Sequence, residues 1–234
     1  MANLSTPSGR FHEGWPEDCT RLSRRIMRNR DAQRFRFVGF YCCLDFINTA
    51  PTRGAERAEL IRNFADLVSW LHEAGLLGTA EAKNAMNRWG GTREGERAHA
   101  RAVAFRARLE EMAEDMAASN PVSNAAIAAI NQELRTRNGY VEIFRSEGGI
   151  AERFRYKPRR AAQLIAPIAE SAASLLCQGS LSLVRRCANP ACGLFFYDTS
   201  KTHRRRWCDM RVCGNRMKVR AFHRRRREAR EAGR

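Results

Sequence analysis

Residues 185–227, RRCANPACGLFFYDTSKTHRRRWCDMRVCGNRMKVRAFHRRRR, carry the most specific pattern in the chain. Cys187 and Cys192 enclose four residues, Cys208 and Cys213 enclose another four, and fifteen residues separate the two pairs. Each short turn can aim two sulfurs at one point, and the longer loop can bring the two turns together around one ion. Four thiolates form the soft, closed ligand shell that zinc prefers. The spacing therefore predicts one structural zinc ion bound by these four cysteines.

Two disulfides or four unrelated thiols are the alternatives to a zinc site. The chain opens with MANLSTPSGR, which has no apolar core of a secretory signal, so we expect a reducing compartment in which disulfides are rare. His203 is the other candidate ligand, and it lies in the polar loop between the cysteine pairs. Since four cysteines are available, His203 is better suited to contact solvent or a phosphate.

The residues around the cysteines predict a compact module. Residues 194–197 form a short strand signal, residues 198–201 a turn and residues 204–207 a returning strand. Asp209 is suited to cap a helix that runs from Met210 onward. The Cys213 thiolate would then lie in the first helical turn, where free N–H groups and the helix dipole stabilise it, and Gly214 would let the backbone approach the metal.

Positive charge is concentrated in this part of the chain. Residues 185–234 contain 14 arginines and two lysines against four acidic residues, so +12 of the formal net charge of +17 lies here. Arginine pairs with phosphate through a planar fork, which favours nucleic acid as the partner. A second interpretation is that Arg186, Arg206, Arg211 and Arg216 neutralise the negative charge of zinc with four thiolates. The predicted nucleic-acid contacts are Arg204, Arg205, Arg206, Arg211, Asn215, Arg216, Lys218, Arg220, Arg224, Arg225 and Arg227.

This stretch resembles the CGNR zinc finger, a family named for the tetrad that stands here as Cys213, Gly214, Asn215 and Arg216. Both cysteine pairs, the Phe-Phe-Tyr-Asp strand, the RRRWC approach and the basic helix match. In bacterial proteins this finger usually follows an ABATE domain, and residues 40–77, which contain LDFINT, look like the start of one. The resemblance implies a stress-responsive transcription regulator with an N-terminal sensor-like domain and a C-terminal DNA-binding finger.

The chain before the finger reads as mainly helical, so the predicted class is mainly α (α+β). Apolar residues at helical spacing and capping signals predict helices, and alternation over residues 140–156 predicts a β-hairpin. Pro167 is expected to kink the last helix before the finger. The finger itself is predicted to be treble-clef-like or ribbon-like and to end in a basic helix. The predicted parts are a basic N-terminal extension (1–35), a helical domain (36–179) and the zinc finger (183–230).

Polar residues interrupt the apolar pattern of the LDFINT segment. They either cap and pair within the fold or line a ligand pocket. On the second interpretation, Asp45, Asn48 and Arg53 are candidate ligand-binding residues for a small-molecule effector.

A DNA-binding regulator is the favoured function. The alternative is an RNA-binding factor associated with the ribosome or RNA polymerase, in which Phe195, Phe196 and Trp207 stack on bases. We predict that the chain is not an enzyme, because it has no HExxH, Gly-rich phosphate loop or nucleophile elbow, and four cysteines fill the zinc shell. No apolar run is long enough to span a bilayer, so we expect a cytoplasmic, nucleoid-associated protein without a membrane partner. A homodimer that reads two half-sites is a further expectation.

Overall fold

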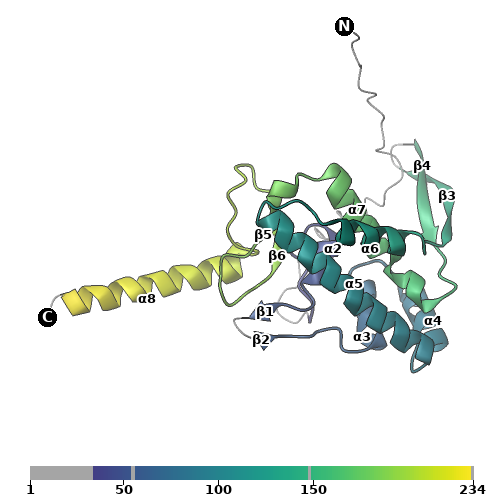
Figure 1. Cartoon of the computed structure of the whole chain (residues 1–234), viewed down its shortest axis with the longest axis horizontal. Coiled ribbons are helices and arrows are strands. Elements are labelled where there is room, and N and C mark those ends of the chain that lie inside the picture. Colours follow the sequence, from purple (N-terminus) through teal and green to yellow (C-terminus); the bar gives the residue numbers. More distant parts are fainter. Residues whose placement is uncertain (1–33, 54–55, 147–148, 233–234) are drawn as a thin grey trace, which may run out of the picture.

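The computed structural model describes residues 34–53, 56–146 and 149–232. The predicted N-terminal extension therefore lies outside the described residues, except for Arg34 and Phe35. The described chain is mainly helical, with small antiparallel two-stranded sheets and a cysteine module that ends in a helix, which confirms the predicted fold class (Figure 1).

Each helix and strand of the described residues has the following bounds. The helices are α2 (Cys42–Ile47), α3 (Phe64–Glu73), α4 (Thr79–Trp89), α5 (Arg93–Ala117), α6 (Asn124–Leu134), α7 (Ala166–Gln178) and α8 (Asn215–Ala232), with the short helical turns η1 (Ala161–Ile165), η2 (Leu181–Leu183) and η3 (Met210–Gly214). The strand pairs are β1 (Thr52–Arg53) with β2 (Glu56–Arg57), β3 (Gly139–Ser146) with β4 (Gly149–Tyr156), and β5 (Val184–Arg186) with β6 (Phe195–Tyr197).

Capping side chains set the start of several helices. Asn63 accepts a hydrogen bond from the backbone N–H of Asp66 at the start of α3, and Ser123 accepts one from Ala126 at the start of α6. Gly75 follows α3 with a φ of 70°, a left-handed conformation that glycine adopts without strain. These local contacts satisfy terminal N–H groups that have no partner within the helix.

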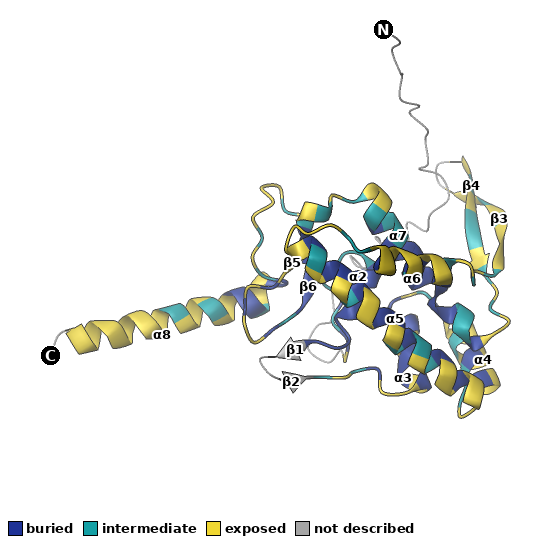
Figure 2. Ribbon diagram, in the orientation of Figure 1, coloured by how far each residue is buried: buried dark blue, intermediate teal, exposed yellow. Residues whose placement is uncertain are grey.

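Helix α2 lies inside the helical domain, and all six of its residues are buried (Figure 2). It packs against α5 and α7, and Phe46 contacts the ring of Trp70 at a centroid distance of 5.0 Å. A fully buried side chain of this size contributes about 1.5–3 kcal/mol relative to an exposed one. The short helix α2 is therefore held by tertiary packing rather than by its own length.

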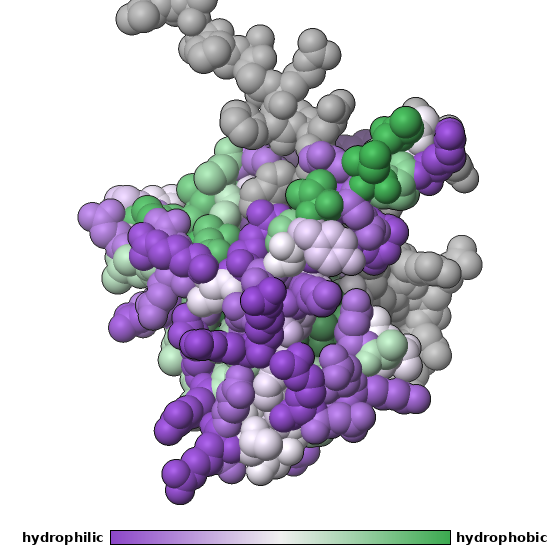
Figure 3. Space-filling model, turned by 90° about the vertical axis from the view of Figure 1, so that its right-hand side faces the viewer, coloured by the Kyte–Doolittle hydropathy of each residue, from purple (hydrophilic) through white to green (hydrophobic). Residues whose placement is uncertain are grey.

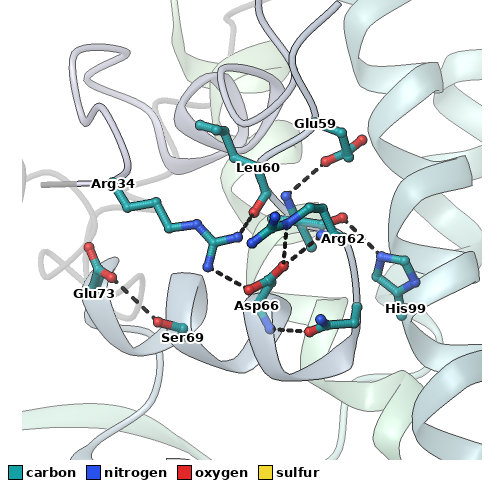
Figure 4. Close-up of polar contacts among 10 residues, drawn as sticks. Arg34, Glu59, Leu60, Arg62, Asp66, Ser69, Glu73 and His99 are labelled. Atoms are coloured by element: carbon teal, nitrogen blue, oxygen red, sulfur yellow. Dashed lines mark hydrogen bonds and ion pairs between the residues drawn. The ribbon is translucent and has the colours of Figure 1, made fainter.

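The start of the described chain is tied to α3 by a polar network (Figure 4). The guanidinium of Arg34 donates to the carboxylate of Asp66 and to the backbone carbonyl of Leu60. The hydrogen bond from Arg34 lowers the pKa of Asp66 to about 2. Phe35 is buried in the core beside this network. Arg34 and Phe35 thus pack as part of the helical domain, although the sequence interpretation assigned both to the extension.

The predicted hairpin is present as β3 and β4 and stands at one side of the helices (Figure 1). Its base is joined to the body where Tyr156 donates to Glu170 and the guanidinium of Arg137 lies 3.5 Å from the ring centroid of Phe154. Figure 3 looks at this side of the molecule and shows hydrophobic residues gathered at its upper edge. Four large hydrophobic side chains of the hairpin are exposed: Tyr140, Val141, Ile143 and Ile150.

Pro167 does not kink a long helix, contrary to the sequence expectation. The turn η1 precedes it, and Pro167 stands in the first turn of a new helix, α7. Proline is tolerated there because the first N–H groups of a helix have no partner within the helix. The prediction was wrong because the apolar pattern runs without a break through both elements.

Candidate metal centre and nucleic-acid interface

Cys187, Cys192, Cys208 and Cys213 come together in one buried cluster, as predicted. Their four sulfur atoms all lie within 4.8 Å of one another. The sulfur of Cys208 is 3.5 Å from that of Cys192 and 3.8 Å from that of Cys213. A tetrahedral site with zinc–sulfur bonds of about 2.3 Å requires sulfur–sulfur distances of about 3.8 Å. The cluster therefore fits one structural zinc ion with no other ligand.

Cys187, Cys192 and Cys208 are close enough to shift one another's pKa values, and a bound cation would stabilise the thiolate forms of the cluster. Hydrogen bonding between Cys187 and Cys192 lowers the pKa of Cys187 and raises the pKa of Cys192. Hydrogen bonding to Cys187 and Cys192, together with burial, raises the pKa of Cys208. Four thiolates packed this closely repel one another, and a divalent ion removes that penalty. Protein donors also reach the sulfurs: the side-chain amide of Asn189 lies 3.4 Å from the sulfur of Cys213.

The first cysteine pair lies in the loop that joins β5 to β6, and this arrangement differs from the predicted strands. Strand β6 pairs with β5, with Val184 opposite Tyr197 and Arg186 opposite Phe195. Residues 204–207, predicted to be the returning strand, form no strand in the described structure. They pass beside the first pair instead, where the carbonyl of Arg206 accepts from the N–H of Ala188 at 2.8 Å.

The loop between the cysteine pairs is built around Asp198, which is fully buried. Its carboxylate accepts from the Ser200 hydroxyl at 2.6 Å and from the Arg205 N–H at 2.9 Å. Burial acts to raise the pKa of this carboxyl, but the hydrogen bonds and the nearby Arg185 charge outweigh it and lower the pKa. His203 is exposed and lies outside the sulfur cluster. Its ring contacts the Asp198 carbonyl at 3.3 Å.

The second cysteine pair flanks the start of the C-terminal helix, as the sequence predicted. The carboxylate of Asp209 accepts from the N–H of Arg211 at 2.8 Å and so caps the turn η3, which leads into α8. Cys213 is buried in this turn. Gly214 is close to the side chain of Met210, since a Cβ placed there would meet its sulfur at 2.4 Å. Met210 is half-exposed and its side chain is flexible, so a role for Gly214 in letting the backbone approach the metal stays a prediction.

Asn48 and Asp45 connect the helical domain to the zinc module. The side chain of Asn48 donates to the carbonyl of Phe195 at 2.9 Å and accepts from its N–H at 2.8 Å. One oxygen of Asp45 accepts from the N–H groups of Val38 and Gly39, and the carbonyl of Gly39 accepts from Tyr197. Burial raises the pKa of Asp45 to about 7, although these two hydrogen bonds oppose the rise.

These contacts within the protein are the first of the two interpretations that the sequence left open for the LDFINT segment. A ligand-binding role for Asp45, Asn48 and Arg53 stays a prediction. Arg53 lies in strand β1.

The predicted nucleic-acid residues lie in two places, the loop before Cys208 and helix α8. The guanidinium of Arg205 is used within the fold, because it donates to the carbonyls of Trp207 and Cys208 and lies 4.6 Å from the ring centroid of Phe196. The other predicted residues are exposed: Arg204, Arg206, Arg211, Asn215, Arg216, Lys218, Arg220, Arg224, Arg225 and Arg227. Among the arginines proposed to neutralise zinc, Arg186 instead pairs with Glu114 of α5 at 3.6 Å.

Sequence reasoning missed Asn189 and Asp198 as parts of the site. Asn189 is buried in the first cysteine loop and contacts Cys213, while Asp198 shapes the loop that leads to Cys208. Asn189 lies between the first two cysteines, and Asp198 follows the strand signal of residues 194–197. Asn and Asp side chains often bond to backbone groups in such loops, and buried ones are usually hydrogen-bonded. Their position next to the cysteine and strand signals could have identified them.

A helical domain joined to a four-cysteine module with a basic helix defines a zinc-finger protein. Two family models agree with this class. Residues 42–179 match ABATE, described as "Putative stress-induced transcription regulator", and residues 184–226 match the CGNR zinc finger. Because the ABATE match covers more than half of the chain, this protein belongs to the ABATE family. A comparison with curated proteins finds no match. None of the helices in the described ranges has both the length and the apolar character to cross a bilayer.

Proposed function

We propose that this protein is a DNA-binding transcription regulator whose zinc module presents helix α8 to the major groove. The observation that supports this proposal is the exposed position of α8. This helix extends away from the body (Figure 1), and its arginine and lysine side chains are exposed. An α-helix with its side chains is about 10–12 Å wide and fits a major groove about 12 Å wide.

RNA is the less favoured partner. Of the three aromatic residues that an RNA-binding role would use for base stacking, Phe195 and Phe196 are 2% and 0% exposed, and Trp207 is half-buried. The major groove of A-form RNA is deep and narrow, so a helix such as α8 cannot enter it readily. The same basic module would still attract RNA through phosphate contacts, which makes RNA the necessary competitor in a test.

The helical domain supplies the remaining parts of the proposal. It would bind an effector and change how the zinc module is held, because Asn48 and Gly39 bond directly to strand β6. A homodimer would place two α8 helices on half-sites about 34 Å apart, and such a regulator would be associated with the nucleoid. Paired half-sites at this spacing in bound DNA would support the dimer.

Fluorescence anisotropy with the full-length, zinc-loaded chain tests DNA binding. If about six phosphates are contacted, log K should fall with log salt at a slope of about −5, and duplex DNA should compete better than structured RNA. Cys208→Ser should lose both zinc and DNA affinity, whereas Cys177→Ser changes an exposed cysteine outside the cluster and should lose neither. Retained zinc and DNA affinity in Cys208→Ser, or preference for RNA, would contradict the proposal.

A further inference from the structure

Helix α8 carries an exposed face that is not purely basic. Val219 and Phe222 are 54% and 49% exposed on this arginine-rich helix. Asn215, Val219, Phe222 and Arg226 recur at intervals of four, three and four residues, so they form one stripe along the helix. The guanidinium of Arg226 lies 5.6 Å from the ring centroid of Phe222 within this stripe. In a helix that contacted only phosphates, two exposed apolar side chains would add no binding free energy.

Cations flank this stripe on both sides, and the acidic residues lie behind it. At 3.6 residues per turn, Lys218 and Arg225 border one edge of the stripe, and Arg216 and Arg230 border the other. All four are exposed. Among the described residues, none of the four forms an ion pair with a carboxylate. Their charges are therefore available to an anionic partner.

The opposite side of α8 has a different character. Arg224 pairs with Glu228 at 3.7 Å and Arg227 pairs with Glu231 at 3.4 Å, which places both acidic side chains away from the stripe. Met217 and Ala221, also on this side, are the partly shielded residues of α8. The helix thus has a back, which carries both of its glutamates, and a front, which carries no acidic residue.

We propose that Asn215, Val219, Phe222 and Arg226 read base edges in the major groove, while the flanking cations hold the two phosphate backbones. This inference rests on the proposed DNA-binding function. The stripe spans about 16 Å, or about five base pairs. Arginine pairs with guanine, asparagine pairs with adenine, and apolar side chains contact the thymine methyl group. The residues assigned to the stripe include Arg226, which the charge pattern alone did not single out.

The stripe fits a groove better than a lipid surface. A basic amphipathic helix can also lie on an anionic membrane with its apolar face in the acyl boundary. In that position, Asn215 and Arg226, at the two ends of the stripe, would be pressed toward the hydrocarbon with Val219 and Phe222. Between two phosphate backbones, by contrast, a polar residue at each end of the stripe gains a base to bind.

Selection from a random duplex library, followed by affinity measurements on selected and scrambled duplexes, tests the assignment. Arg226→Gln and Arg224→Gln form a matched pair, since both remove one exposed arginine of α8. Both should weaken binding to scrambled DNA slightly. Arg226→Gln should lower the ratio of selected to scrambled affinity by about 10- to 100-fold, while Arg224→Gln should leave that ratio within about twofold. Phe222→Ala should lower the ratio with no change in salt dependence.

The outcomes distinguish failure of base reading by the stripe from failure of the proposed DNA binding. The assignment of the stripe to base reading would be contradicted by an unchanged ratio of selected to scrambled affinity in both Arg226→Gln and Phe222→Ala. A wild-type protein that binds DNA without sequence preference would contradict it too. Either result would leave the proposed DNA binding intact. Binding to phosphatidylglycerol vesicles or RNA without binding to DNA would overturn both the assignment and the proposed DNA binding. Zinc content and circular dichroism of each variant should match the wild type, because none of these side chains is buried.

Discussion

Asn48 shows how one side chain can attach a metal module to a helical domain. It is 2% exposed, and its amide bonds both the N–H and the carbonyl of Phe195, 147 residues away, in the way that a neighbouring strand would. The ring of Phe195 enters the same core as the helices. Loss of the amide would leave two buried backbone groups of β6 without a partner, and such groups are costly.

We expect Asn48→Ala to lower the free energy of unfolding by about 3 kcal/mol, because two buried backbone groups lose their partners. Urea denaturation followed by circular dichroism measures the change. Asn131→Ala removes an asparagine from an exposed position on α6 and should alter stability by less than about 0.5 kcal/mol. Equal effects of the two substitutions would show that the amide is not a structural link.

Asp45 makes stability depend on pH, because its pKa is about 7 in the folded protein against 3.8 for an ordinary aspartate. Between these values the folded chain keeps a proton that the unfolded chain releases. The free energy of unfolding should therefore fall as pH rises from about 4 to 7, and this contribution should be level above pH 7. Burial likewise raises the pKa of Glu170 to about 7, which acts in the same direction.

Asp45→Asn isolates this contribution. Both backbone N–H groups donate to the same oxygen of Asp45, so an asparagine oxygen can accept both hydrogen bonds. The variant should gain stability relative to the wild type as pH rises from 5 to 8. The zinc ligands titrate in both proteins and cancel in the difference, which urea denaturation at several pH values measures. Parallel pH profiles for the two proteins would contradict the expected titration of Asp45.

At the scale of elements, local patterns encode what could be predicted. Helices α3 to α6 have capping residues or glycine stops in the sequence, and β3–β4 alternates around a turn, so the helices and the hairpin could be predicted from local signals. The strand that pairs with β6 was not predicted correctly. Strand β5 has three residues, too few for a pattern, and its pairing depends on a loop closed by the cysteine cluster. The four cysteines could be predicted because their spacing alone carries the signal.

Contacts across long sequence separations could not be predicted in the same way. The LDFINT segment signalled polar residues on a buried helix, but nothing in its local pattern names Phe195 or Val38 as partners. Arg224 and Arg227 were among the predicted nucleic-acid contacts, but the sequence interpretation did not name their ion pairs with Glu228 and Glu231.

Helix α8 should contribute binding without contributing stability, because none of its residues is buried. Replacing Arg224, Arg225, Arg226 and Arg227 together by glutamine should reduce the magnitude of the salt slope for DNA binding by about 1 to 2, because Arg224 and Arg227 lie on the back of the helix. The midpoint of urea unfolding should change little. Anisotropy at several salt concentrations and circular dichroism measure the two effects. An unchanged slope would mean that this run of arginines lies away from the phosphates.

At the scale of the whole molecule, the zinc module contributes residues to the core of the helical domain, while its four cysteines, Leu194 and Phe196 form a second buried cluster. Val184 and Phe195 of the module pack in the same buried cluster as Leu109 and Ile168 of the helices, and β5 lies against α5. Family matches divide the chain near residue 180, but the core of the helical domain extends across that division through Val184 and Phe195. A boundary between sequence families therefore need not be a boundary between folding units, and the described structure predicts that these two parts unfold together.

Coincident transitions would be the signature of such coupling. We expect the loss of helical circular dichroism in urea and the release of zinc to a coloured chelator to share one midpoint. In Asn48→Ala, which breaks the link to β6, zinc should be released at a lower urea concentration than that at which the helices unfold. Zinc release well before helix loss in the wild type would mean that the module is an independent unit. The helical domain could then influence α8 only weakly, because a change in one unit alters another only through free energy shared between them.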